Sequence, residues 1–137
     1  MTGAFGSWNT EGRNPPTGIP GFFQGLSSAG PIAVADGQTV HVTGFASINN
    51  PEKLSGQLFC TIFFVPVAVG SALTPVGAEQ EHDVSGDVPT FQIGSTALIE
   101  KLPAGNYIVG LAARVPPSGS LPNMLSATAG ACTALIF

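Results

Sequence analysis

Charge is what this sequence has least of. Charged residues make up 9% of its 137 residues, against about 25% in an ordinary soluble domain. The cations Arg13, Lys53, Lys101 and Arg114 are scattered along the chain, whereas nucleic-acid binding requires clusters of cations that neutralise phosphates. We therefore exclude nucleic acid as a partner. A neutral surface gives little electrostatic protection against association, so we expect neighbouring subunits to cover much of it.

Catalytic motifs are also missing. The sequence contains no G-x-S-x-G, H-E-x-x-H, Walker or Gly-rich dinucleotide motif. His41 lies in an alternating strand pattern and is expected to face outward or to be hydrogen-bonded, and nothing in the sequence brings a histidine to a serine and an aspartate. We predict a protein that is not an enzyme and has no cofactor.

The second histidine, His82, lies in the most acidic stretch of the chain, residues 79–87. Clustered carboxylate oxygens are ligands that Ca²⁺ prefers, but the spacing matches no EF-hand loop. A solvated acidic loop is therefore favoured over a metal site. The carboxylates of this stretch are Glu79, Glu81, Asp83 and Asp87.

No segment has the pattern of a signal peptide or a membrane span. The first 18 residues have neither a basic region nor a continuous apolar region. The longest apolar run, residues 58–70, is shorter than the roughly 20 residues that a spanning helix needs, and it contains Pro66. We expect synthesis in the cytoplasm without a signal peptide and no membrane partner. In that compartment Cys60 and Cys132 are expected to stay as free, buried thiols.

What the chain does contain is glycine, proline and apolar residues. It has 18 Gly and 12 Pro, and 44% of its residues are hydrophobic. Disordered chains contain few hydrophobic residues, so this composition indicates a folded domain. Residues 1–30 are dense in Gly and Pro and show no strand or helix period, so we predict an extended N-terminal arm. Whether the arm lies on its own domain or docks on another protein stays open. Its candidate docking residues are the aromatics Phe5, Trp8, Phe22 and Phe23.

Residues 31–137 are predicted to form one all-β domain. Residues 39–48 alternate as a half-buried strand does, whereas residues 57–69 are apolar on both faces, so we expect both faces to be covered. Residues 70–90 are expected to form a charged loop with at most one edge strand, and Gly94 is expected to break the next strand with a bulge. The small residues of the terminal strand, 127–137, predict close packing of backbones. Seven or eight strands without a helix indicate an antiparallel β-sandwich of jelly-roll type.

The stretch Leu102-Pro103-Ala104-Gly105-Asn106-Tyr107 is typical of a corner before a strand. Proline sets φ at its start, Gly105 or Asn106 is expected to take the position of positive φ, and the ring of Tyr107 packs back over the turn. The stretch resembles the tyrosine corner of fibronectin- and immunoglobulin-like sandwiches. It also resembles the corner that precedes the penultimate strand of jelly-roll knobs of the tumour-necrosis-factor and complement-C1q type.

The second resemblance fits better, because one loop and one apolar strand follow the corner and end the sequence. Over residues 85–137 the sequence is similar to phage capsid decoration proteins, head fibres and tail-fibre knobs. The resemblance implies a virion structural protein that assembles as a homotrimer and contacts a major capsid protein or other virion proteins. The apolar strands are expected to meet across subunits through Phe59, Phe63, Val65, Leu135 and Phe137.

Two other functions remain open from the sequence alone. One is a fibronectin- or immunoglobulin-like binding module on a bacterial surface or phage tail. The other is a small carbohydrate-binding or hydrolytic sandwich. Sugar-binding sandwiches usually stack sugars on exposed Trp and Tyr rings, and this sequence has only Trp8 and Tyr107, which weakens the carbohydrate-binding interpretation.

Overall fold

The described part of the chain forms eight β-strands in a computed structural model. The structure describes residues 2–8, 24–50, 53, 55–68, 71–114 and 126–137. No helix in this described part of the chain is long and apolar enough to cross a membrane. The strands are β1 (Thr2–Trp8), β2 (Gln24–Val34), β3 (Val40–Asn49), β4 (Gly56–Pro66), β5 (Thr74–Val84), β6 (Thr90–Ile99), β7 (Gly105–Arg114) and β8 (Ser126–Ile136).

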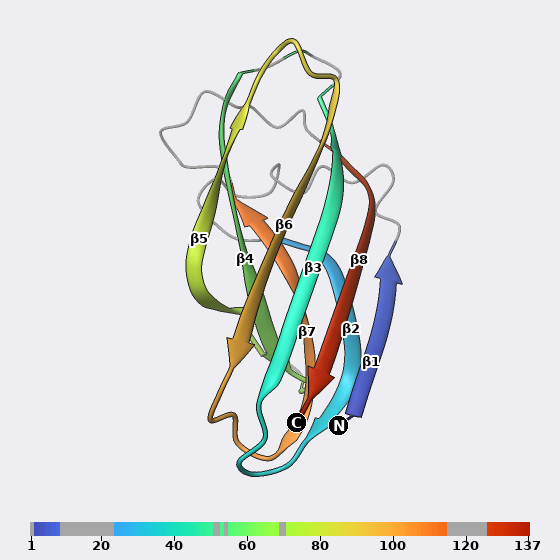
Figure 1. The fold of residues 1–137 in the computed structure, drawn as a ribbon, viewed down its shortest axis with the longest axis vertical. Helices are drawn as coiled ribbons and strands as arrows, with labels where there is room; N and C mark the ends of the chain where they lie inside the picture. Colours follow the sequence, from blue (N-terminus) through green and yellow to red (C-terminus); the bar gives the residue numbers. More distant parts are fainter. Residues whose placement is uncertain (1, 9–23, 51–52, 54, 69–70, 115–125) are drawn as a thin grey trace.

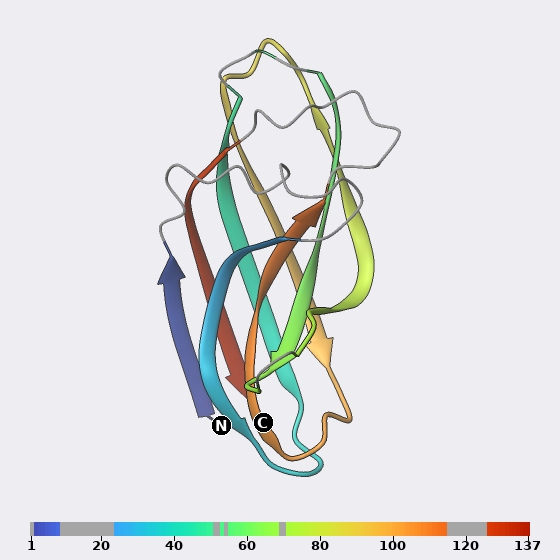
Figure 2. The same cartoon turned by 180° about the vertical axis from the view of Figure 1, so that it is seen from behind.

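The strands form two four-stranded sheets that face each other (Figures 1 and 2). Sheet A has the order β1-β8-β3-β6 and sheet B the order β2-β7-β4-β5. All neighbouring strands are antiparallel. Apart from β4 and β5, consecutive strands lie in different sheets, which is the double Greek-key arrangement of a jelly roll. The predicted all-β jelly-roll sandwich is confirmed.

The core fills the space between the sheets because each strand places alternate residues inside. In β3, Val40, Val42 and Ile48 are completely buried, while Thr43 and Phe45 between them are exposed. Each such buried aliphatic side chain contributes about 1.5–3 kcal/mol relative to exposure. The strands of sheet B supply Leu26, Leu58, Ile62, Val109 and Leu111, and β8 adds Cys132, Ala134 and Ile136.

The predicted division of the chain at residue 30 differs from the structure. β1 pairs with β8 from Thr2↔Ile136 to Trp8↔Gly130, so it is a strand of sheet A. β2 begins at Gln24 and runs through the expected boundary. Phe5 and Trp8 therefore lie on β1, while Phe22 and Phe23 lie outside the described residues. Removal of residues 1–29 would take away one strand and half of another.

The edge strand that the sequence allowed within residues 70–90 is present: β5 has 11 residues and pairs with β4. One further expectation about strands needs correction. Gly94 produces no bulge, because β6 keeps an unbroken register with β3 from Val40↔Ile99 to Asn49↔Thr90. The register shifts lie in other strand pairs, for example between Cys60 and Ile62 of β4.

The corner before β7 is held by a hydrogen bond. The Tyr107 hydroxyl donates to the Pro103 carbonyl oxygen at 2.6 Å, and Tyr107 and Leu102 are both buried. The edge of the Tyr107 ring meets Phe64, with the two centroids 6.0 Å apart. This is the bond of a tyrosine corner, in which the hydroxyl bonds back to the chain a few residues upstream. The positive φ expected at Gly105 or Asn106 is wrong, because Lys101, directly before the corner, takes it at 61° and neither of those residues does.

We predict that Tyr107→Phe lowers the free energy of unfolding by about 1 kcal/mol, because one hydrogen bond is lost without loss of packing. Chemical denaturation of both proteins measures the difference. An unchanged unfolding free energy would mean that the hydroxyl bond does not stabilise the corner.

Glycine is required at position 110, where β7 pairs with β2. A Cβ built on Gly110 would overlap the Ser27 carbonyl oxygen and lie 2.9 Å from the Phe63 ring. Ser27 in turn lies against β8, where a Cβ on Gly130 would be 2.9 Å from the Ser27 Cβ. The close backbone packing expected for the terminal strand is therefore found at Gly130.

We predict that Gly110→Ala destabilises the protein by several kcal/mol, on the order of 3, because backbone atoms cannot move aside as a flexible side chain can. The matched control is Gly105→Ala, whose Cβ would meet the Tyr107 ring at an ordinary 3.7 Å. Thermal unfolding should separate the two variants, and equal melting temperatures would contradict the packing described for Gly110.

Candidate interaction surfaces

The residues expected to form the subunit interface lie on opposite sides of the sandwich. Phe59, Phe63 and Val65 belong to β4 of sheet B, whereas Leu135 belongs to β8 of sheet A and Phe137 follows it. A single face therefore does not contain both sets. Contacts of both sets with other copies would therefore use two different faces of the sandwich.

The middle of the outer face of sheet B is already buried within one chain. Thr61 and Ala112 are completely buried and Phe63 is only 5% exposed. The Phe63 ring lies over two glycines, because a Cβ on Gly25 or Gly110 would touch it. The expectation that β4 is covered on both faces is confirmed at these positions, and Phe63 has little surface left for a partner.

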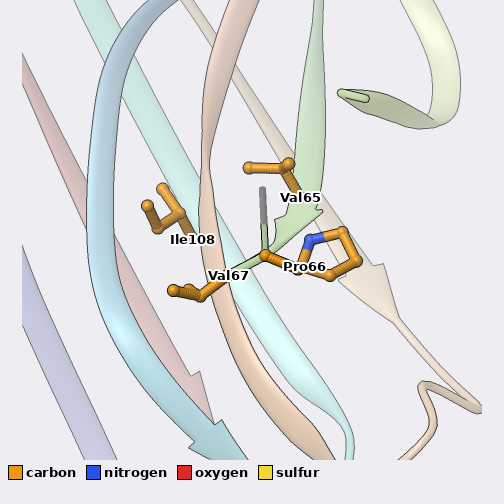
Figure 3. A pocket seen from close by; sticks show the side chains of 5 residues that line it. Val65, Pro66, Val67 and Ile108 are labelled. Atoms are coloured by element: carbon orange, nitrogen blue, oxygen red, sulfur yellow. The ribbon is translucent and has the colours of Figure 1, made fainter. Parts of the chain in front are cut away.

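An apolar hollow lies at one end of this face (Figure 3). Its volume is about 480 Å³, and it is lined by Val65, Pro66, Val67, Ala68 and Ile108. Val65 and Ile108 are cross-strand partners, and Val67 is 51% exposed. The hollow is therefore an open apolar surface, and its described lining residues provide no polar side chain to orient a small ligand.

The other end of the face carries charge. Arg114 donates to both carboxylate oxygens of Glu79, from Nε at 3.0 Å and from the terminal nitrogen at 2.6 Å. Its guanidinium carbon also lies 4.9 Å from the centre of the Phe59 ring. Phe59 is thus half-buried beneath an ion pair rather than in an open apolar patch.

The acidic residues are spread along the edge strand β5. Glu79, Glu81 and Asp83 are exposed on it, and His82 between them is half-buried. Within the described residues, no group of three or more His, Cys, Asp or Glu side chains is arranged to hold a metal ion. The described acidic residues therefore offer an exposed carboxylate edge and no chelating cluster.

Sheet A differs from sheet B because its four strands contain no Asp, Glu, Lys or Arg. We call its outer surface over β3, β6 and β8 the neutral face. Its described side chains include His41, Thr43, Phe45, Thr96, Leu98, Thr133 and Leu135.

Hydroxyl and imidazole groups on the neutral face bond to one another. His41 Nε2 lies 2.9 Å from Thr96 Oγ1, which lies 3.0 Å from Thr43 Oγ1 and donates to the Val42 carbonyl oxygen. The expected outward, hydrogen-bonded position of His41 is confirmed. These polar groups are hydrogen-bonded to one another, so a partner that covers them need not supply hydrogen bonds of its own.

Large apolar side chains surround these polar groups. Phe45 is 45% exposed, Leu98 53%, and Phe137 at the end of β8 56%. Sequence reasoning missed Phe45 and Leu98. The alternation that buries Val40 and Val42 places Phe45 on the opposite side of β3, so following that period would have found it.

Comparison with known proteins supports the fold but names no family. No protein-family model and no curated protein matches this sequence. A chain in the structure of infectious bursal disease virus, Gx strain, superimposes with a TM-score of 0.57 at 12% sequence identity. The match covers 98% of this chain and 33% of the viral chain, so this chain spans about a third of the length of the protein it matches. The likeness shows the fold alone.

The two cysteines are free, buried thiols on opposite sheets, as expected. Burial raises the pKa of each thiol from 9.0 to about 11, and at Cys60 hydrogen bonding with the Gly94 backbone opposes part of this rise. Because folding favours the protonated thiols, their contribution to stability is complete below about pH 9 and is lost as the pH rises through 11.

We predict that iodoacetamide labels the folded protein at pH 8 at least about 100-fold more slowly than the urea-unfolded protein, because the raised pKa leaves few thiolates. The unfolding free energy should fall between pH 9 and 11, and it should fall less in the Cys60→Ala/Cys132→Ala variant. Equal labelling rates for folded and unfolded protein would contradict the burial of these thiols.

Proposed function

We propose that the chain is a non-enzymatic structural protein of a virus particle, either a decoration protein of a capsid or the knob of a fibre. The observation that carries this proposal is the neutral face, a sheet surface without formal charge that exposes large apolar side chains. Such a surface is costly to leave in water and is well suited to contact with other protein. The fold shared with a chain of a virus structure supports the assignment.

The proposed assembly is a homotrimer in which the outer face of sheet B contacts the neutral face of the next copy. A contact between two different faces is heterologous and closes into a ring when the rotation allows it. Val65 beside the apolar hollow, together with Leu135 and Phe137, would lie in this contact. Phe63 would support it from within the chain, and Phe59 would contribute the surface around the ion pair between Arg114 and Glu79.

The proposed partners beyond the trimer are a major capsid protein or other virion proteins. The docking role assigned to Phe22 and Phe23 stays a prediction about residues outside the described part of the chain. Phe5 and Trp8 would dock as part of β1 and not as part of a free arm, because their backbone pairs with β8.

A fibronectin- or immunoglobulin-like binding module fits the structure less well. Those domains divide their strands into sheets of the ABED and CFG type, whereas this chain has two sheets of four in jelly-roll order. Only the tyrosine corner is shared with them. We therefore retain the virion proposal.

The test is co-sedimentation of the purified chain with particles from a culture that produces it. We expect Phe45→Asp to reduce binding at least about tenfold, because it places an unpaired charge in an apolar contact, and to leave the melting temperature nearly unchanged because Phe45 is half exposed. Gln80→Asp on the exposed edge strand β5 is the control with the same change of charge, and it should bind as the native chain does. Failure of the native chain to co-sediment would contradict the proposal.

A further inference from the structure

The two sheets have four edge strands, and three of them are poor sites for adding another strand. β5 carries Glu79, Glu81 and Asp83 and is interrupted by Pro75 and by Gly77 at a φ of 76°. Charge, proline and irregular backbone all oppose edge pairing. The two remaining obstructed edges are β2 and β1.

β2 contains Pro31, which has no N–H to donate, and shows two register shifts against β7. β1 lies beside β2 of the other sheet in both views (Figures 1 and 2), and it is a short strand of seven residues that includes two glycines, Gly3 and Gly6. β2 therefore offers a neighbour an interrupted edge, and β1 offers a shorter and weaker one than β6.

β6 is the exception. It is ten residues long, contains no charge and no proline, and pairs with β3 without a register shift from Thr90 to Ile99. No described strand pairs with its other side. The backbone N–H and C=O groups on that side are therefore aligned to accept another strand.

Side chains beside this edge are apolar on both faces of the sheet. Leu98 is 53% exposed on the neutral face, and Phe91 and Ala97, which pack against the core from the inner side, are only half-buried. A strand added here would cover all three, so hydrophobic burial would add to the backbone hydrogen bonds.

We propose that β6 pairs antiparallel with β6 of a second copy of this chain, joining two A sheets into one sheet of eight strands. A twofold axis places the same strand against itself in antiparallel direction, and the uncharged β6 then meets no like charge. The acidic β5 of another copy would offer carboxylates and an interrupted backbone instead. This contact goes beyond the proposed function and does not depend on a virus particle.

Charged residues near the contact predict how self-association responds to salt. β5 lies next to β6 in the other sheet at this side of the sandwich (Figure 1), so pairing of two copies brings two acidic strands toward each other. Repulsion between exposed carboxylates is screened by salt. Self-association through β6 therefore strengthens as the salt concentration rises.

The experiment measures the mass of the full chain by analytical ultracentrifugation. The variant is Gln92→Lys/Leu98→Lys, which places lysines on the edge, and the control is Ala35→Lys/Ala104→Lys, which adds the same charge at exposed positions outside the strands. We expect the β6 variant to have half the mass of the native chain and the control to keep the native mass. The native mass should correspond to two chains if only twofold pairing occurs, and to six chains if twofold pairing joins two of the proposed trimers.

Engineered cysteines test the strand pairing directly. Directly opposed residues of antiparallel strands lie within disulfide reach, so either Gln92→Cys/Leu98→Cys or Gln92→Cys/Thr96→Cys should form a covalent dimer on oxidation. A native chain that is monomeric, or that forms trimers unaffected by the β6 lysines, would overturn the inference, as would the absence of a covalent dimer in both cysteine variants. A native dimer that the lysines dissociate would support it and would reject only the trimer.

Discussion

Burial of apolar side chains between the two sheets is the interaction on which the rest of the structure depends. Consecutive strands mostly lie in opposite sheets, so the pairs β1–β8 and β2–β7 join distant parts of the chain. Closing such long loops costs entropy before any contact offsets it. Burial of residues such as Ile48, Leu58 and Leu111, which are completely buried, provides the offsetting free energy. Strand pairing and core formation must therefore occur together, and the glycines that let backbones approach are part of the same requirement.

The distribution of charge gives the sandwich two distinct sides. The described carboxylates of the strands all lie on β5, whereas sheet A has no formal charge in any of its four strands. A core requires apolar residues only on the inner face of each sheet, so the exposed Phe45 and Leu98 are not explained by folding. In the proposed assembly, contact with other protein would cover them and leave the acidic edge in water. The orientation of the chain in an assembly would follow from this asymmetry.

The sequence alone predicted much of the fold, and the reasons for the errors are physical. Period-two alternation identified β3, and the corner at Tyr107 was found from local turn chemistry. The boundary at residue 30 was wrong because β1 and the first half of β2 are rich in glycine and serine, and pairing with distant strands overrides their weak strand propensity. The residues expected to share one subunit interface lie on different sheets, and a local sequence pattern does not reveal to which sheet a strand belongs. Gly105 or Asn106 was expected to have the positive φ that Lys101 takes, because such a choice depends on how the whole turn is packed.

Electron cryo-microscopy of particles purified from a culture that produces the chain tests the central claim most directly. The account predicts density for the two-sheet sandwich at regular positions on the particle, with the neutral face of sheet A turned toward neighbouring protein and the acidic strand β5 toward solvent. Particles without such density, from a culture in which the chain stays in the supernatant, would contradict the assignment of this protein to the virion.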